Sequence, residues 1–162
     1  MTDRISAGIL LFRRAGGGTS RRDQVEVLLG HPGGPYFAGK DLGDWSIPKG
    51  EVGPDEDLEN VARREFAEET GHPVPAGPLI PLGSIRQKGG KLVHAWAAEG
   101  DLDPAAAVSN TFAMPWPPGS ETLAEFPEID RVAWFAPAEA RRRIKEAQVP
   151  FVDRLEEALR TP

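Results

Sequence analysis

The sequence predicts an α/β protein, because short apolar runs typical of strands alternate with segments of helical periodicity. The strand-like runs are rich in Val, Ile, Leu and aromatic residues and lie at residues 5–12, 25–29, 79–85, 92–98 and 131–135. The helical segments lie within residues 50–72, at 137–147 and from Pro150 onward. A chain of 162 residues is long enough to bury a sizeable core, so we expect one domain spanning residues 1–162.

The composition excludes several classes of protein. The absence of cysteine rules out disulfides, thiolate metal sites and a cysteine nucleophile. The apolar run near the N-terminus is too short for a signal peptide or a membrane span, so we expect a cytoplasmic protein without a membrane partner. The net charge of −6 argues against a broad basic face and hence against a stable nucleic-acid complex, but it allows a local basic pocket for phosphates. The sequence says nothing about oligomeric state.

The first two strands are expected to form a hairpin. Residues 5–12 (ISAGILLF) form a buried strand, residues 25–29 (VEVLL) form the returning strand, and the Gly-rich segment 15–23 is a flexible turn. A Gly/Pro-rich loop follows at 31–44 and carries Tyr36. Tyr36 either folds back on the core or stacks on a nucleobase. His31, at the start of the loop, is expected to be structural rather than catalytic.

The stretch from Gly50 to His72 organises the chain. A short strand at 45–50 leads into a Gly-rich turn and then a helix, which Asp55 can cap and Gly71 ends. At about 100° per residue, the apolar stripe of the first helical turns continues into three carboxylates, those of Glu65, Glu68 and Glu69. Like charges at these spacings repel, and a hard divalent cation, Mg²⁺ or Mn²⁺, is the natural compensation. The alternative is an ordinary Glu-rich amphipathic helix.

The full spacing favours the metal-binding interpretation. Gly50, five residues, Glu56, seven residues and then Arg64-Glu65-Phe66-Ala67-Glu68-Glu69-Thr70-Gly71 resemble the Nudix box, G-x5-E-x7-R-E-U-x-E-E-x-G-U, where U is bulky and apolar. Every charged position and both glycines match, and only His72 departs, at the final U. The WSIPKGE segment at 45–51 is similar to the subgroup that includes dinucleoside-polyphosphate and diphosphoinositol-phosphate hydrolases.

This resemblance implies a Nudix fold, an α/β/α sandwich with a mixed β-sheet in which the box forms a catalytic loop-helix-loop. It also implies metal-dependent hydrolysis of a nucleoside diphosphate linked to another moiety. By resemblance, Glu65, Glu68 and Glu69 bind the Mg²⁺ or Mn²⁺ ions together with the carbonyl of Gly50. Arg64 is expected to orient these glutamates.

Three roles remain open within the resemblance. The general base is Glu65, Glu68 or Glu128, the last because an acidic residue before Trp134-Phe135 adds a ligand or base in some family members. Glu125 is the reserve for Glu128, and a solvated carboxylate is the alternative for both. Glu56 is either an outer ligand or the partner of Arg64.

The predicted substrate contacts are basic residues and one aromatic residue. Lys49 adjoins the Gly50 turn, where the backbone can approach a phosphate closely, although it could be a plain surface lysine. Arg86, Lys88 and Lys91 lie at the predicted hairpin turn 87–91, where the alternative is a solvated hairpin end. With Tyr36, these residues make a phosphoanhydride small molecule the expected partner.

Residues 101–125 are predicted to form a shaped loop of open role, containing a stiff extended stretch at 114–119. Three functions remain: a hydrolase of dinucleoside polyphosphates or nucleoside triphosphates, a house-cleaning hydrolase of modified nucleoside triphosphates, and a nucleotide-binding regulator without turnover.

Overall fold

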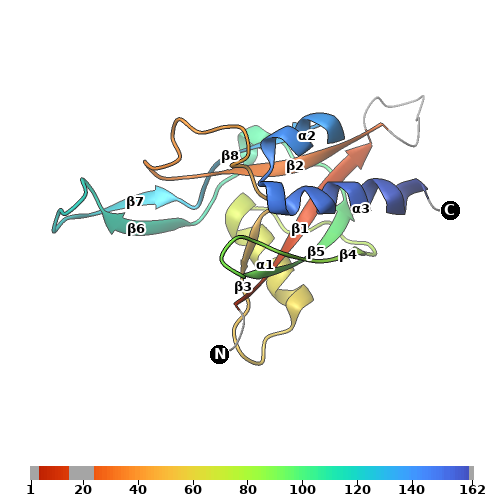
Figure 1. Ribbon diagram of the computed structural model, residues 1–162, viewed down its shortest axis with the longest axis horizontal. Helices are drawn as coiled ribbons and strands as arrows, with labels where there is room; N and C mark the ends of the chain where they lie inside the picture. Colours follow the sequence, from red (N-terminus) through yellow and green to blue (C-terminus); the bar gives the residue numbers. More distant parts are fainter. Residues whose placement is uncertain (1–3, 15–23, 161–162) are drawn as a thin grey trace.

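A computed structural model describes residues 4–14 and 24–160 and contains a six-stranded mixed sheet (Figure 1). Its strands are β1 (Ile5–Arg14), β2 (Val25–Pro32), β3 (Lys49–Glu51), β4 (Ile80–Arg86), β5 (Leu92–Glu99) and β8 (Ile129–Phe135). The strand order is β4-β5-β1-β2-β8, with β3 paired to β1. β1 runs parallel to β5, while every other pairing within this sheet is antiparallel.

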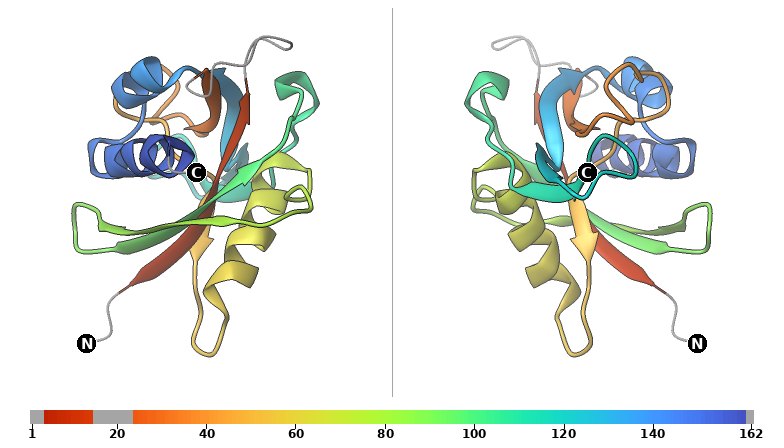
Figure 2. Two further views of the ribbon diagram at one scale, coloured as in Figure 1. Left: turned by 90° about the vertical axis from the view of Figure 1, so that its right-hand side faces the viewer. Right: turned by 90° about the vertical axis from the view of Figure 1, so that its left-hand side faces the viewer.

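Helices cover both faces of the sheet: α1 (Leu58–Thr70) on one side, α2 (Pro137–Arg143) and α3 (Val149–Arg160) on the other (Figure 2). The alternation of β1 explains this arrangement. Ile9 joins the core under α1 with Phe66, while Leu10 joins the opposite core with Phe151 of α3. The expected α/β/α sandwich with a mixed sheet is confirmed.

A second, two-stranded sheet projects from the sandwich and will be called the arm (Figure 1). It consists of β6 (Thr111–Pro115) and β7 (Leu123–Pro127), which pair in antiparallel register. A single 3-10 turn, η1 (Pro104–Ala106), precedes it. The prediction of a loop over 101–125 was therefore wrong for the arm, where Phe112 of β6 contacts Phe126 of β7 at a ring-centroid distance of 6.1 Å.

The predicted helix at 137–147 was too long. α2 ends at Arg143 because the backbone N–H of Lys145 donates to the carbonyl of Trp45 at 2.8 Å instead of continuing the helix. A 3-10 turn, η2 (Glu146–Gln148), then leads into α3. The predicted strand at 45–50 is regular only from Lys49, since Trp45 forms an isolated bridge with Ile144.

Two predictions about the connections between strands are confirmed by the structure. The turn at 87–91 between β4 and β5 is confirmed, with the N–H of Gln87 donating to the carbonyl of Lys91 at 2.8 Å. The predicted pairing of the first two strands is confirmed in antiparallel register. The predicted flexible turn at 15–23 lies outside the described residues. No helix in the described part of the chain is long and apolar enough to cross a membrane.

Candidate active site

The candidate site is built on the segment from β3 through α1. Gly50 of β3 pairs with Ala7 of β1, which fixes β3 to the central sheet. The carboxylate of Asp57 caps α1 by accepting the N–H of Asn60 at 3.0 Å, so the prediction of Asp55 as the cap was wrong. The helix ends, as expected, at Gly71 in the left-handed conformation. Both ends of the helix are therefore anchored.

Glu65 lies directly over Gly50. A Cβ atom on Gly50 would sit 1.6 Å from Oε1 of Glu65, a distance that no side chain could accept. The Glu65 side chain is only 17% exposed, so the carboxylate has little room to retreat. The glycine at this position thus has a steric reason, which is to admit the Glu65 carboxylate against the backbone of β3.

Burial and neighbouring carboxylates raise the pKa values of two box glutamates, Glu65 and Glu69. Burial, followed by the hydrogen bond and charge of Glu68, raises the pKa of Glu65 to about 7. Burial, followed by the charge of Glu65, raises the pKa of Glu69 to about 8, although the charge of Lys49 and its backbone N–H act in the opposite direction. Such crowding of carboxylates is electrostatically unfavourable without a metal cation, and the charges of Arg64 and Lys49 offset it only in part.

The donor chemistry fits a hard divalent cation. Carboxylate oxygens are the ligands that Mg²⁺ and Mn²⁺ prefer. Because Gly50 has no Cβ atom, the backbone of β3 lies directly beside the Glu65 carboxylate. Within residues 4–14 and 24–160, however, no three acidic, His or Cys side chains are already arranged as a metal-binding group. The ligand set of Gly50, Glu65, Glu68 and Glu69 therefore stays a prediction, for which the structure supplies proximity.

Arg64 sits among the carboxylates. Its Nη1 donates to Oε2 of Glu56 at 2.6 Å, while its Nε lies 3.6 Å from Glu65 and 4.0 Å from Glu68. Glu56 also accepts the N–H of Gly53 at 2.7 Å, which closes the loop before α1. These contacts fit the orienting role expected of Arg64 and favour Glu56 as its partner.

Lys49 and Glu128 both lie near Glu69, because the charge of each acts on its carboxylate. Burial, and then the charges of Lys145 and Lys91, lower the pKa of Lys49 to about 8, which does not fit a freely solvated surface lysine. Glu128 is exposed between β7 and β8, and its charge is one of the causes that raise the pKa of Glu69. Glu128 thus lies near enough to Glu69 for its charge to act on it, whereas Glu125 lies on the arm.

The other predicted contacts divide into two places. Arg86 and Lys88 line a cavity of about 1020 Å³ between the β4–β5 turn and the end of α2, which will be called the basic cavity. Tyr36 is 57% exposed and meets Trp116 of the arm edge to face, with ring centroids 5.6 Å apart. Tyr36 and Lys88 therefore do not line the same cavity.

Sequence reasoning missed the α2 side of the basic cavity. Arg141, Arg142 and Lys145 line it together with the two predicted residues. The signal was present in the sequence as the basic run RRRIK at 141–145. Ile144 of this run is buried in the core, which turns its basic neighbours toward the surface.

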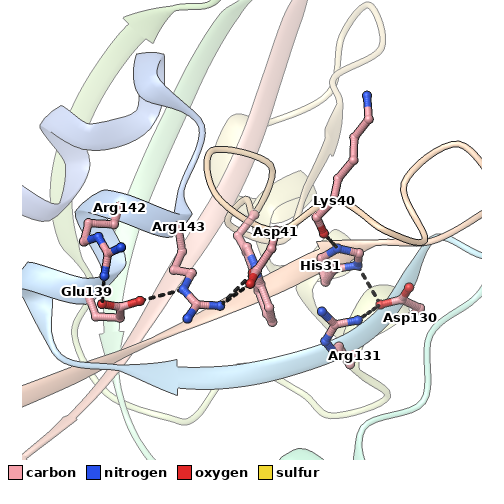
Figure 3. Close-up of polar contacts among 9 residues, drawn as sticks. His31, Lys40, Asp41, Asp130, Arg131, Glu139, Arg142 and Arg143 are labelled. Carbon is pink, nitrogen blue, oxygen red and sulfur yellow. Dashed lines mark hydrogen bonds and ion pairs between the residues drawn. The ribbon is translucent and has the colours of Figure 1, made fainter.

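A separate polar network anchors the loop at 33–44 (Figure 3). The buried His31 has Nδ1 2.9 Å from Asp130 and Nε2 at the carbonyl of Lys40. Arg143 of α2 holds the carboxylate of Asp41 at 2.6 Å. This network fits the expected structural role of His31.

Comparison with known proteins places this geometry in a family. The model of the NUDIX domain matches residues 2–155. The chain belongs to the NUDIX domain family. A Mycolicibacterium smegmatis NUDIX relative named 8-oxo-(d)GTP phosphatase is 33% identical over 136 residues, or 78% of this chain and 39% of that protein. The matched chain thus spans about two fifths of that relative's length.

Two solved structures share the NUDIX fold. The NUDIX domain of Shewanella oneidensis NrtR, complexed with ADP ribose, aligns with a TM-score of 0.65 and 18% identity over 98% of this chain and 90% of that one. A C. elegans Ap4A hydrolase aligns with a TM-score of 0.63 and 19% identity over 96% and 98% of the two chains. At these identities the likeness is one of fold.

Proposed function

We propose that this protein is a metal-dependent pyrophosphohydrolase that cleaves a nucleoside diphosphate linked to another moiety, acting in the cytoplasm on small molecules. The observation that carries the proposal is the seat of the Glu65 carboxylate over Gly50, with Glu68 and Glu69 crowded beside it. Mutual repulsion of carboxylates gives no benefit to a fold that binds no cation. A phosphoanhydride hydrolase, in contrast, needs such carboxylates to hold the metal ion that neutralises its substrate.

Each residue then has a task in hydrolysis. Glu65, Glu68 and Glu69, with the carbonyl of Gly50, would hold Mg²⁺ or Mn²⁺. The bound ion supplies charge neutralisation at phosphate oxygens and a more acidic water. Arg64 keeps the carboxylates in place through its bond to Glu56 and its proximity to Glu65 and Glu68.

The remaining steps use groups at the border of the site. Lys49 offers an ammonium to a phosphate oxygen of the substrate, and its charge is stabilised once that anion is bound. The water proton passes to one carboxylate, that of Glu65, Glu68 or Glu128. Catalysis then depends mainly on positioning and electrostatics.

Dinucleoside polyphosphates are the leading substrate class. The WSIPKGE segment and the fold shared with an Ap4A hydrolase support this choice. Modified nucleoside triphosphates are the second candidate, supported by the relative named 8-oxo-(d)GTP phosphatase. A nucleotide-binding regulator without turnover is disfavoured because all three box glutamates are present.

The test is a substrate screen of the purified protein with Mg²⁺ or Mn²⁺. The panel contains nucleoside triphosphates, 8-oxo-dGTP, dinucleoside polyphosphates, nucleotide sugars, ADP-ribose and diphosphoinositol phosphates, with products separated by chromatography. Metal-dependent cleavage of a nucleotide class is expected. Activity confined to inorganic pyrophosphate, or nucleotide binding without any turnover, would contradict the proposal.

The carboxylates themselves are tested by Glu68→Gln and Glu69→Gln. Each variant should lower kcat by about 100-fold or more, because amides are poor ligands for hard cations. Glu59→Gln is the matched control, since Glu59 lies on the same helix and pairs only with Arg63 among the described contacts. If all three variants turned over at the wild-type rate, the carboxylates would have no part in the mechanism.

A further inference from the structure

The basic cavity lies outside the metal-binding carboxylates but on a shared framework. Its lining residues come from the β4–β5 turn on one side and from the end of α2 and η2 on the other. α2 lies on the face of the sheet opposite α1 (Figure 2). Its volume of about 1020 Å³ is large enough for a ligand of nucleotide size. No step of the proposed hydrolysis uses it.

The lining of this cavity is strongly cationic. Five of its eleven lining residues are Arg or Lys and one is acidic: Arg86, Lys88, Arg141, Arg142, Lys145 and Glu146. In a chain of net charge −6, this is a local reversal of sign. Such a reversal in a concave site attracts an anionic ligand.

Among the residues that the structure describes, some of these cationic side chains form ion pairs with acidic residues, and others do not. Arg141 is bound by Asp153 and Glu156 of α3, and Arg142 by Glu139 at 2.9 Å. In the described part of the chain, the ammonium groups of Lys88 and Lys145 form no hydrogen bond or ion pair at contact distance. Lys145 is only half exposed, so it carries its charge where solvent screening is reduced.

The basic cavity is coupled rigidly to the segment that carries Lys49 and Gly50. The buried Gln148 accepts the N–H of Ile47 at 3.1 Å and donates to Oε1 of Gln87, a cavity residue, at 2.9 Å. The N–H of Lys145 donates to the carbonyl of Trp45 at 2.8 Å. The segment 45–50 is therefore hydrogen-bonded to the framework of the cavity at Trp45 and Ile47, while its Gly50 lies under the Glu65 carboxylate.

We propose that the basic cavity binds the part of the substrate beyond the scissile anhydride, and that this part carries at least two phosphate groups, which contact Lys88 and Lys145. The inference rests on the proposed function. It predicts selection for small molecules with three or more phosphates over diphosphate-linked compounds such as ADP-ribose. A bounded cavity in a chain without a broad basic face favours a small polyphosphate over an RNA backbone.

The kinetic test compares diadenosine tetraphosphate with ADP-ribose as substrates of the full chain. Lys145→Ala and Lys88→Ala should each raise KM for the tetraphosphate by about 10-fold, the loss expected of one charge-assisted contact. The rise should exceed that for ADP-ribose by about fivefold, with kcat for the tetraphosphate changed less than KM. Lys145→Arg should recover most of the loss, because the charge is kept.

Two controls separate this from a structural effect. Lys40→Ala removes an exposed lysine outside the cavity and should leave both KM values unchanged. Thermal unfolding should show unchanged stability for Lys88→Ala, whose side chain is exposed on a turn. Unchanged KM in both cavity variants, or equal losses on the two substrates, would overturn the inference. Preferred turnover of a 5′-triphosphorylated RNA over diadenosine tetraphosphate would also overturn it.

A binding measurement distinguishes failure of the inference from failure of the proposed function. Inorganic triphosphate is titrated by calorimetry into Glu68→Gln protein without divalent metal, so that turnover plays no part. We expect saturable binding that Lys145→Ala weakens by about 10-fold. Binding with no turnover of any substrate by the wild type would refute only the hydrolase. Turnover by the wild type, together with a triphosphate affinity that Lys145→Ala leaves unchanged, would refute only the inference about the cavity.

Discussion

At the scale of single residues, Gly50 carries the tightest constraint in the site. Because a Cβ atom there would lie 1.6 Å from Oε1 of Glu65, Gly50→Ala must displace either the carboxylate or β3. We expect kcat to fall by about 100-fold, since misplacement by about 1 Å can cost that much. Gly39→Ala is the matched control, because a Cβ atom at Gly39 meets nothing within 4 Å. Near wild-type turnover of Gly50→Ala would show that Glu65 need not occupy this position.

Glu69 predicts a pH dependence of stability in the metal-free protein. Its pKa in the folded state is raised to about 8, above the ordinary 4.5, so the folded protein retains a proton that the unfolded chain releases. This contribution to stability is fully present below about pH 4.5 and is lost as pH rises toward 8. Glu69→Gln cannot lose a proton in this window.

The measurement is thermal unfolding of both proteins in a chelator at pH 5, 6 and 7.5. The Tm of Glu69→Gln relative to wild type should increase across this series, by at least about 3 °C in total, which corresponds to about 1 kcal/mol in a chain of this size. Lys49, whose pKa is lowered to about 8, is still mostly protonated at all three pH values in both proteins. A difference that stays constant with pH would mean that Glu69 titrates normally.

At the scale of elements, the end of η2, just before α3, holds three parts of the protein together. The fully buried Gln148 bonds the N–H of Ile47, the hydroxyl of Ser46 and the side chain of Gln87. Gln148→Ala leaves the Ile47 N–H without this partner, and we expect a loss of about 2 kcal/mol in the free energy of unfolding. Chemical denaturation measures it, and Gln87→Ala, which removes only the outer bond, should cost less. Equal costs would place the stabilisation at the turn.

The elements also show where sequence patterns suffice. The strands and α1 follow from apolar periodicity and from the end signal at Gly71, which are local properties. The arm was missed because prolines around its tip suggested a stiff loop, although Phe112, Met114 and Phe126 already show the alternation of paired strands. The early end of α2 could not be read locally, since it is fixed by the bond of Lys145 to Trp45, about a hundred residues away in the chain.

At the scale of the whole molecule, the acidic and the basic groups lie on opposite faces of the sheet. The glutamates of α1 lie on one face of the sheet, and the basic cavity borders α2 and α3 on the other. The sequence predicted the acidic half because its spacing lies within one helix. The basic half joins two segments, 86–88 and 141–145, which only the folded sheet brings together.

A divalent cation held by the box glutamates, as proposed, would be a ligand of the folded state alone. The unfolded chain disperses Glu65, Glu68 and Glu69, so binding of Mg²⁺ or Mn²⁺ must raise the free energy of unfolding, by about 2.7 kcal/mol at a metal concentration 100 times Kd. In a chain of this size that corresponds to about 5–10 °C in Tm.

Thermal unfolding with Mn²⁺, set against NaCl of equal ionic strength, checks this expectation. Glu68→Gln and Glu69→Gln should show a smaller Mn²⁺ shift than wild type, and Glu59→Gln the full shift. The comparison removes general screening, because all four proteins respond to NaCl through the same surface charges. An equal Mn²⁺ shift in all four would place the cation elsewhere on this acidic protein and leave the crowding of the box glutamates without a metal to explain it.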